Sequence, residues 1–467
     1  RRVAAQTNYT NDDHGTAMMK ATIITLLVAL VAVVAVAGQS HIIKEEIKGA
    51  PLGWTKLERA DPSQPIDITI LVKQQNIDQL IDIFERVSNP KSSDYGQYLT
   101  NDEVNELVAP KEQHIAAVMQ WLHYNKIKTT ESIAMTPNRD MIHISMTVGE
   151  AESLLQTHYH EYSHASGLTQ VVRAERYSIP AYLVDAIDVI GPTVRFPSQS
   201  TVLHSKKRDI VSPPMHTLKA AKLKKMKKSN PIQDACSQGT TPDCLKQLYS
   251  VNGYTATSPN TSLATTGYLE QYISPSDLAQ FFQSYDPTHA RTATIIGPND
   301  PTNPGVEASL DIQYTMGVAQ GVPTQFWYTA GRQPLNPDNE PFLVFLLNLS
   351  STADAPWVIS TSYGDDEHTV DYSYAVRVNQ EFAKAAVRGI SILFSSGDGG
   401  VSGGQSQPCT TFIPTYPAGS PFVTSVGGTT GFNPESGVYF SSGGFSNYWP
   451  RADMAKYQLK AVEDYFT

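Results

Sequence analysis

The chain has 467 residues, of which 40% are hydrophobic and 17% charged, so it is long enough for two or more domains and is not generically disordered. Its 45 acidic and 35 basic residues give a net charge of -10, which argues against a nucleic-acid partner because such binders must neutralise phosphates. With three cysteines and no CxxC pair, we expect neither a disulfide-dense small fold nor a zinc site.

The N-terminal region has the features of a secretory signal peptide. Met18 and Lys20 precede an apolar run that ends in the small-x-small pattern Ala35-Val36-Ala37. We therefore interpret residues 18–37 as a signal peptide. Two threonines interrupt the run, and about 20 apolar residues are needed to span a bilayer, so we expect no stable membrane anchor. Residues 1–17 contain no Met and resemble no targeting signal, and we interpret them as a non-native leader.

Residues 40–204 alternate between strand-like and helix-like patterns, which predicts a compact α+β domain. In chain order the pattern predicts a strand over 66–72, a helix over 77–87, a helix over 112–123, a strand over 141–146 and a helix over 148–157.

A basic segment follows this domain. Nine Lys or Arg residues and one Asp lie between Ser205 and Lys228, whereas residues 229–467 carry 21 acidic against 9 basic residues, a balance of -12. A nuclear-import or nucleic-acid tail would also fit such a run, but a secreted chain has no use for one. We therefore interpret residues 205–229 as an exposed linker that is cut during processing.

Residues 230–467 change to an α/β order, which predicts a mainly parallel sheet. The pattern predicts strands over 292–296, 325–329, 357–361 and 390–396, and helices over 305–320 and 372–388. Ligands bind such sheets at the carboxyl ends of the strands, so we expect chemistry in the loops after Thr361 and Ser396.

Two covalent modifications fit a secretory route. Cys236 and Cys244 enclose a short loop that a disulfide could close in an oxidising compartment. Cys409 is left over, which suggests a partner beyond the end of the chain. Asn260 and Asn348 each begin an Asn-x-Ser pattern and are candidate glycosylation sites.

The first candidate for chemistry is the pair Glu307 and Asp311. Four residues apart on a predicted helix, the two carboxylates lie on one face. Two like charges in contact raise the pKa of at least one of them, which suits proton transfer under acidic conditions. A solvated acidic helix face is the commoner explanation for such a pair taken alone.

The second candidate is Asp398, in a Gly-rich run that follows an apolar strand, although an ordinary Asp-Gly turn is the alternative. The third candidate is the segment 360–364, where a strand ends in a loop that could pair with an extended peptide. The candidate substrate-binding residues in it are Ser360, Ser362, Tyr363 and Gly364. Ten of the twelve histidines precede residue 230, so a carboxylate base is favoured over a Ser-His-Asp triad.

Taken together, these motifs resemble the sedolisins, or serine-carboxyl peptidases, and within them the tripeptidyl-peptidases. The resemblance covers about residues 50–467. It rests on Glu307 with Asp311 and on residues 87–99, 357–367, 391–400, 416–429 and 442–446.

The resemblance implies a subtilisin-like α/β catalytic domain over residues 230–467, incomplete here, preceded by a ferredoxin-like α+β prodomain that acts as an intramolecular inhibitor. It implies that Glu307 is the general base, that Asp311 orients it and that a protonated Asp398 stabilises the oxyanion, which requires low pH or a raised pKa. Expected substrates are peptides or unfolded proteins, and the expected location is the secretory pathway, either a lysosome or acidic vacuole or the extracellular space.

The sequence departs from the family pattern at its end. The family's nucleophile lies in a Gly-Thr-Ser motif followed by a calcium site, and neither occurs before Thr467. Ser442 and Ser446 belong to a different motif and are not expected to act as the nucleophile. We therefore expect a truncated chain that lacks both peptidase activity and calcium ligands. An acid endopeptidase of the same family and a non-catalytic peptide-binding pseudoprotease remain as alternatives.

Overall fold

The computed structural model describes residues 40–467 except 52, 128–132, 166–169, 197–231, 233–234, 259, 332–338, 404–409, 433 and 451–455. The expected leader, signal peptide and processing linker lie outside the described residues, as does Cys409. In the part of the chain that is described, no helix combines the length and apolarity needed to cross a membrane.

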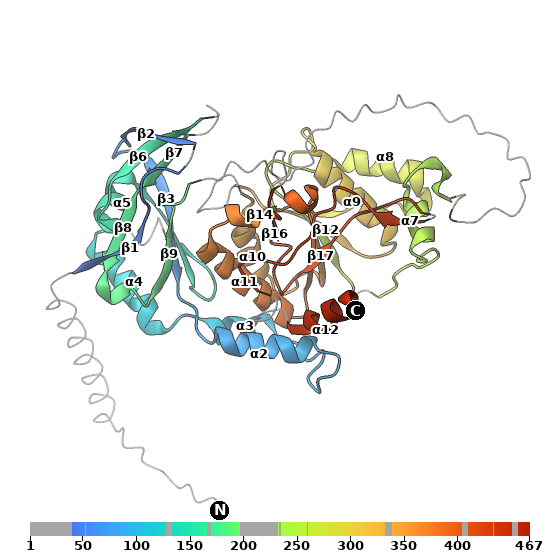
Figure 1. Ribbon diagram of the computed structural model, residues 1–467, viewed down its shortest axis with the longest axis horizontal. Helices are drawn as coiled ribbons and strands as arrows, with labels where there is room; N and C mark the ends of the chain where they lie inside the picture. The colour runs from blue at the N-terminus through green and yellow to red at the C-terminus, as the bar shows by residue number, and fades with distance from the viewer. Residues whose placement is uncertain are drawn as a thin grey trace, which may run out of the picture.

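The first domain spans residues 40–196 and is built on antiparallel sheets (Figure 1). Its strands are β1 (His41–Glu46), β2 (Trp54–Arg59), β3 (Pro65–Val72), β4 (Ile133–Met135), β5 (Met141–Thr147), β6 (Tyr159–His164), β7 (Gln170–Ala174), β8 (Arg176–Pro180) and β9 (Ile187–Gly191). Its helices are α2 (Ile77–Ser88), α3 (Asn101–Val108), α4 (Glu112–Tyr124) and α5 (Val148–Leu155). The strands form sheets of order β4-β5-β3-β9 and β2-β6-β7 and the pair β1-β8.

Residue patterning explains the largest of these sheets. Ile68 pairs with Ile144 across β3 and β5, and both side chains are buried in the core of this domain. Thr147 then begins α5 with a capping box, in which its hydroxyl accepts from the Glu150 amide and the Glu150 carboxylate accepts from the Thr147 amide. The predicted α+β architecture of the first domain is confirmed.

The second domain is built on a six-stranded parallel sheet of order β11-β12-β10-β13-β15-β17. These strands are β10 (Leu263–Gly267), β11 (Thr294–Ile296), β12 (Thr324–Tyr328), β13 (Val358–Thr361), β15 (Ser391–Ser395) and β17 (Thr424–Val426). Short antiparallel pairs are formed by β14 (Asp365–Asp366) with β16 (Thr415–Tyr416) and by β18 (Thr429–Thr430) with β19 (Ser436–Gly437). The helices are α7 (Pro242–Leu248), α8 (Pro275–Tyr285), α9 (Val306–Val318), α10 (Phe342–Ser350), α11 (Tyr372–Val387) and α12 (Leu459–Phe466).

Helices cover both faces of the parallel sheet. Successive residues of β12 point to opposite faces: Phe326 packs with α8 and α9, whereas Trp327 packs with α10 and α11. This arrangement is the layered α/β structure that the alternating pattern predicted, and the prediction of a mainly parallel sheet is confirmed.

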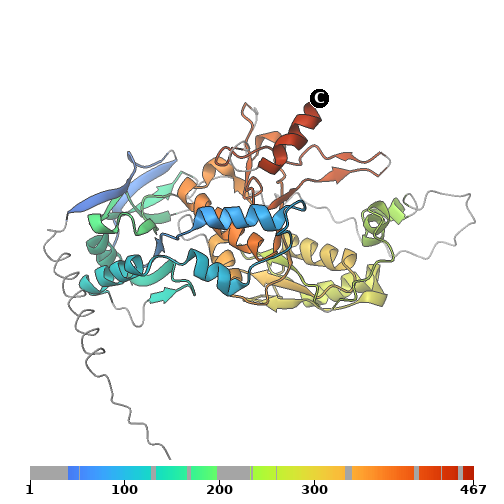
Figure 2. The same cartoon turned by 90° about the horizontal axis from the view of Figure 1, so that it is seen from below.

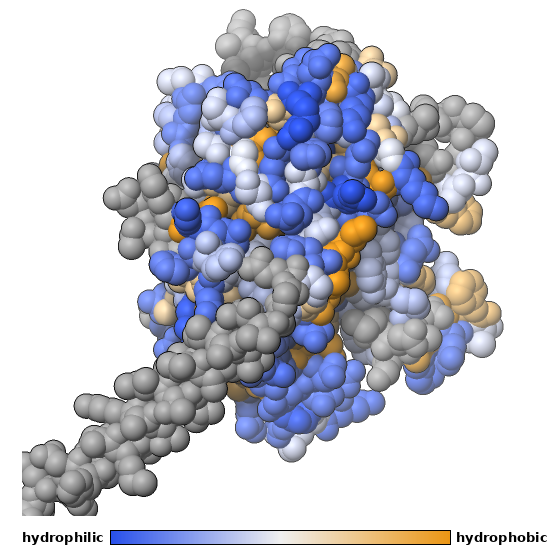
Figure 3. Space-filling model, turned by 90° about the vertical axis from the view of Figure 1, so that its left-hand side faces the viewer, coloured by the Kyte–Doolittle hydropathy of each residue, from blue (hydrophilic) through white to orange (hydrophobic). Residues whose placement is uncertain are grey.

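The first domain reaches the second through α2, which packs on α11, and α3 packs beside α2 (Figure 2). Leu80 packs with Ala383 and Val387, and the rings of Phe84 and Phe422 are 4.8 Å apart. On the side facing away from the second domain, the first domain is mostly hydrophilic, with apolar side chains confined to narrow strips (Figure 3). By contrast, the α2–α3 face of the first domain makes an apolar contact with the second domain.

A buried ionic network joins the domains beside this apolar contact. The Arg377 guanidinium on α11 lies 2.5 Å from the Asp140 carboxylate of the first domain, and Lys384 lies 2.7 Å from Glu381. All four side chains are at most 2% exposed. Gln74 donates hydrogen bonds to Asp140 (2.6 Å) and to Glu381 (3.0 Å), so it connects the two carboxylates across the interface.

The charges and hydrogen bonds of this network determine the pKa of Asp140. Burial alone would raise it, but the charges of Arg377 and Lys384, helped by hydrogen bonds from Thr136 and Gln74, lower the pKa of Asp140 below its usual range. Asp140 therefore stays ionised at acidic as well as neutral pH.

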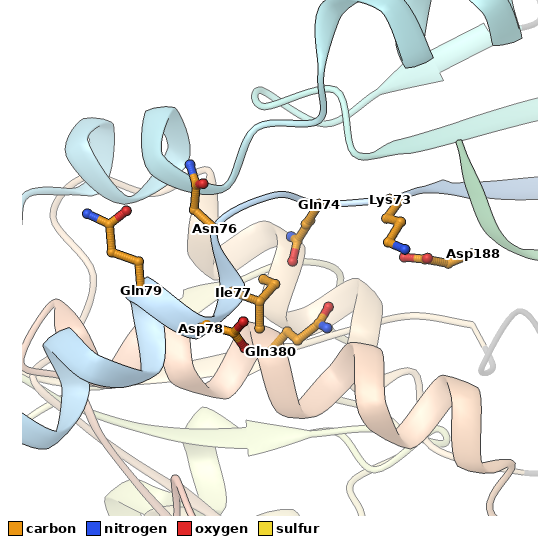
Figure 4. Close-up of a pocket in the computed structure, with 8 residues that line it drawn as sticks. All are labelled: Lys73, Gln74, Asn76, Ile77, Asp78, Gln79, Asp188 and Gln380. Carbon is orange, nitrogen blue, oxygen red and sulfur yellow. The ribbon is translucent and has the colours of Figure 1, made fainter. Parts of the chain in front are cut away.

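A polar cavity of about 530 Å³ opens next to the network, at the boundary between the domains. Lys73, Asn76 and Asp188 line it from the first domain and Gln380 from α11, and Figure 4 shows the side chains of Lys73 and Asp188 pointing toward one another. Burial raises the pKa of Asp188, opposed by the charges of Arg377 and Lys73.

Candidate active site

The first turn of α9 carries Glu307. Its start is fixed by the preceding segment, because the Gly305 amide donates to the Tyr272 carbonyl (2.9 Å) and the Glu307 amide donates to the Gln271 side chain (3.2 Å). A Cβ atom at residue 305 would lie 2.8 Å from the backbone Cα of Gln271, so a larger residue here would force the backbone to shift. The inner face of the helix packs into the core through Ile312.

Asp311 lies one turn further along α9 and contacts the end of β13. The Ser362 hydroxyl donates to Asp311 Oδ1 (2.7 Å), and Asp311 Oδ2 is shielded from solvent without a hydrogen-bond partner among the described residues. Burial and the charge of Glu307 raise the pKa of Asp311 to about 8, although the Ser362 hydrogen bond opposes the shift. Asp311 is therefore protonated at acidic and neutral pH, with Oδ2 as the oxygen left to carry the proton.

Asp398 follows the neighbouring strand. Thr361 of β13 pairs with Phe394 of β15, so the loops that carry Ser362 and Asp398 leave the same edge of the sheet side by side. Asp398 itself is exposed. The sheet order thus brings the predicted general base Glu307, its partner Asp311 and the predicted oxyanion residue Asp398 to the same edge of the sheet.

The four predicted substrate-binding residues divide into two kinds. Ser360 and Ser362 are partly exposed. Tyr363 is buried, with its ring 4.9 Å from that of Tyr268, and a Cβ atom at Gly364 would lie 2.7 Å from the Tyr416 carbonyl oxygen. Binding of a peptide by this segment stays a prediction.

Two further carboxyl groups near the site were missed from the sequence. Asp365 on β14 and Glu340 before α10 are both buried, and Asn339 donates to Asp365 (2.5 Å). Burial, together with the charge and hydrogen bond of Glu340, raises the pKa of Asp365 well above its usual range. Asp365 is therefore a carboxyl group that keeps its proton above the pH at which an exposed Asp loses it. No pattern marks it in the sequence, because Glu340 and Asp365 lie in separate segments.

Ser446 has a structural partner. Its hydroxyl donates to the buried Glu367 carboxylate, which also accepts from the Asn447 amide (2.7 Å). The same hydroxyl accepts from the amides of Tyr448 and Trp449, 3.0 Å in each case. This arrangement caps a turn and is consistent with the expectation that Ser446 is not the nucleophile.

The expected disulfide between Cys236 and Cys244 is present. Asn260 and Asn348 are both exposed, and their glycosylation stays a prediction.

The expectation of no zinc site assumed that the sequence contains no HExxH pattern, which is wrong, because residues 160–164 match this pattern. HExxH binds zinc when it lies on a helix. Here the segment is strand β6, where residues four apart are separated by about 13 Å, too far to share an ion. Across the described ranges, no group of three or more His, Cys, Asp or Glu side chains could hold a metal ion. We assign no ligands in this part of the chain to the calcium ion that the resemblance implies.

Comparison with known proteins agrees with this architecture. Residues 52–196 match the pro-kumamolisin activation domain. The chain is 34% identical to tripeptidyl-peptidase 1 of Mus musculus and of Bos taurus, over 89% of this chain and 71% of each relative. It is 32% identical to tripeptidyl-peptidase SED2 of Arthroderma otae, over 95% of this chain and 76% of the relative. The chain belongs to the sedolisin family of serine-carboxyl peptidases and carries the activation domain of that family over residues 52–196.

Proposed function

We propose that this protein is the zymogen of an acid tripeptidyl-peptidase, which releases tripeptides from the free N-termini of peptides or unfolded proteins. The names of its relatives support the reaction class. The observation that carries the proposal is the Glu307–Asp311 pair. Burial and the like charge of Glu307 raise the pKa of Asp311 to about 8, so Asp311 keeps its proton at acidic and neutral pH.

In this proposal Glu307 is the general base. Because Asp311 is neutral below pH 8, Glu307 is the charged member of the pair and can accept a proton from a hydroxyl nucleophile. Asp311 orients Glu307, and the Ser362 hydroxyl holds Asp311 Oδ1 in place. If Glu307 and Asp311 were both ionised, their negative charges would repel each other.

Asp398 acts on the substrate carbonyl. When protonated, its carboxyl group can donate a hydrogen bond to the oxyanion that forms as the nucleophile attacks. This role favours acidic conditions, since an exposed Asp is protonated only at low pH.

The nucleophile in this proposal is the serine of a Gly-Thr-Ser motif, which residues 1–467 do not contain. Without that serine we expect no turnover, because removing the nucleophile of a serine protease costs about 10⁶ in rate.

The activation domain keeps the enzyme inactive until it is processed. The buried contacts with α11 support its role as an intramolecular inhibitor. Cleavage in the basic segment 205–229 would separate the domains, and the signal-peptide pattern at 18–37 supports a route through the secretory pathway to an acidic compartment or the cell exterior.

The test uses a protein that extends this chain to include the serine. Glu307→Gln and Asp398→Asn should each lower kcat by about 10² to 10⁴ at acidic pH, because each removes a proton-transfer or charge-binding group. Glu463→Gln, at an exposed position on α12, is the matched control. Folding is checked by circular dichroism, and near-wild-type turnover by a folded Glu307→Gln variant would overturn the proposal.

A further inference from the structure

The turn that carries Asp398 is rich in glycine. Gly397, Gly400 and Gly403 all have positive φ, at 99°, 60° and 58°. Glycine adopts these angles without strain but also moves freely, so such a turn holds one shape only if other residues fix it. Contacts to the backbone on either side of the exposed Asp398 therefore help to position it.

Ser442 makes two such contacts, one on each side of Asp398. Its amide donates to the Gly397 carbonyl (2.9 Å), and its hydroxyl accepts from the Gly399 amide (3.0 Å). The Ser442 side chain is only 7% exposed. Ser442 thus forms hydrogen bonds with the peptide groups immediately before and after Asp398, and we call this pair of hydrogen bonds the Ser442 clamp.

The hydroxyl is the part of this clamp that depends on residue type. Any residue at position 442 except proline can donate its amide to Gly397, but only an oxygen on the side chain can accept from Gly399. Ser441 lies beside it and makes different contacts, to the Gly428 amide (2.9 Å) and the Ser396 hydroxyl (3.2 Å).

We propose that Ser442 is a positioning residue, whose hydroxyl fixes the Asp398 turn in the conformation that meets the oxyanion. The proposal rests on the proposed function of Asp398. A catalytic group must be held to within about 0.5 Å of its productive position, and residues behind it supply that precision. The contact with Gly399 also gives the Ser442 hydroxyl a role other than that of nucleophile.

The first measurement needs no catalysis. In the full chain, Ser442→Ala should speed hydrogen exchange of the Gly399 amide about 2- to 10-fold, the range expected for one lost hydrogen bond. Ser441→Ala is the matched control and should leave that amide unchanged. Equal exchange in wild type and Ser442→Ala would overturn the clamp whether or not the protein is a peptidase.

The second measurement uses the protein extended to its serine. Ser442→Ala should lower kcat about 10- to 100-fold with KM within about twofold of wild type, because a displaced Asp398 weakens oxyanion binding and not substrate binding. Ser442→Thr should retain most activity and Ser442→Val should not, a comparison that keeps side-chain size constant if the Ala variant unfolds. Faster exchange with unchanged kcat would overturn the catalytic part of the proposal. Loss of activity in Ser442→Ala but not in Asp398→Asn would instead overturn the function proposed for Asp398.

Discussion

Asp311 at the active site and Asp140 at the domain interface both carry desolvated carboxyl groups, yet their pKa values shift in opposite directions. Asp311 has Glu307 as its charged neighbour, and its pKa is raised to about 8. Asp140 has Arg377 and Lys384 as neighbours, and its pKa is lowered. Burial alone would raise both values, so the sign of the neighbouring charge decides whether a buried carboxyl carries a proton.

The difference separates the two regions in what acid does to them. Because the pKa of Asp140 lies well below the usual range for Asp, Asp140 is protonated only in strong acid. The Asp140–Arg377 contact therefore persists in an acidic compartment. A second ion pair, Arg195 with Asp371 at 2.8 Å, behaves in the same way because Arg195 lowers the pKa of Asp371 against the effect of burial. Burial raises the pKa of Glu45, which also faces Arg195. Acid therefore removes a desolvated charge there and leaves the Arg195–Asp371 pair.

The largest expected effect comes from removing the cation at the interface. Arg377→Met leaves Asp140 and Glu381 buried with Lys384 as their remaining cation, and it should lower the free energy of unfolding by about 3 to 5 kcal/mol. Urea unfolding of the full chain at neutral pH measures the loss.

The control for this variant is Arg86→Met. Arg86 forms an exposed ion pair with Asp94 in the first domain, and such pairs contribute about 0 to 1 kcal/mol. Equal losses for the two variants would show that burial of the Asp140 network adds nothing to stability.

The next effect is the reverse one at the active site. The pKa of Asp311 is about 3.8 when unfolded and about 8 when folded, so the folded protein loses stability as pH rises between these values. Asp311→Asn does not titrate. Its stability relative to wild type should therefore increase from pH 4 to pH 8 by a few kcal/mol, since each pKa unit corresponds to about 1.4 kcal/mol.

Thermal unfolding across this pH range measures the difference, with Asp464→Asn on the exposed end of α12 as the control. A constant difference between Asp311→Asn and wild type would mean that Asp311 titrates normally.

The smallest expected effect is an absence of pH dependence. A lowered pKa contributes stability that is present above the unfolded pKa and is lost only as pH falls through the folded pKa. The difference in unfolding free energy between wild type and Asp140→Asn should therefore stay constant between pH 7 and pH 5. A difference that disappears in that window would make Asp140 an acid switch.

Much of the fold could be predicted because periodicity is a local property. The strand expected over 66–72 is β3, and the helix expected over 305–320 is α9. Strand β10 was not predicted although it lies within the parallel sheet, because two of its five residues, Thr265 and Thr266, are polar. Both are fully buried, and Thr266 donates to Thr361 on the next strand (3.1 Å). Tertiary packing here overrides the residue pattern.

The candidate site divides in the same way. Glu307 and Asp311 could be paired from the sequence, because a spacing of four places both on one helix face. The contacts of Ser362 with Asp311 and of Ser442 with the Asp398 turn join segments that only the fold brings together. The pKa of Asp311 depends on its burial, which spacing does not reveal.

The proton on Asp311 is the central claim, and titration of its carboxyl group tests it most directly. Carbon-13 NMR of the full chain with labelled Asp, assigned with Asp311→Asn, follows the Asp311 carboxyl signal from pH 4 to pH 9. The midpoint should lie near 8, and it should fall in Glu307→Gln because the neighbouring charge is gone. A midpoint near 4 that does not respond to Glu307→Gln would contradict the claim that the two carboxyl groups act as a proton-holding pair.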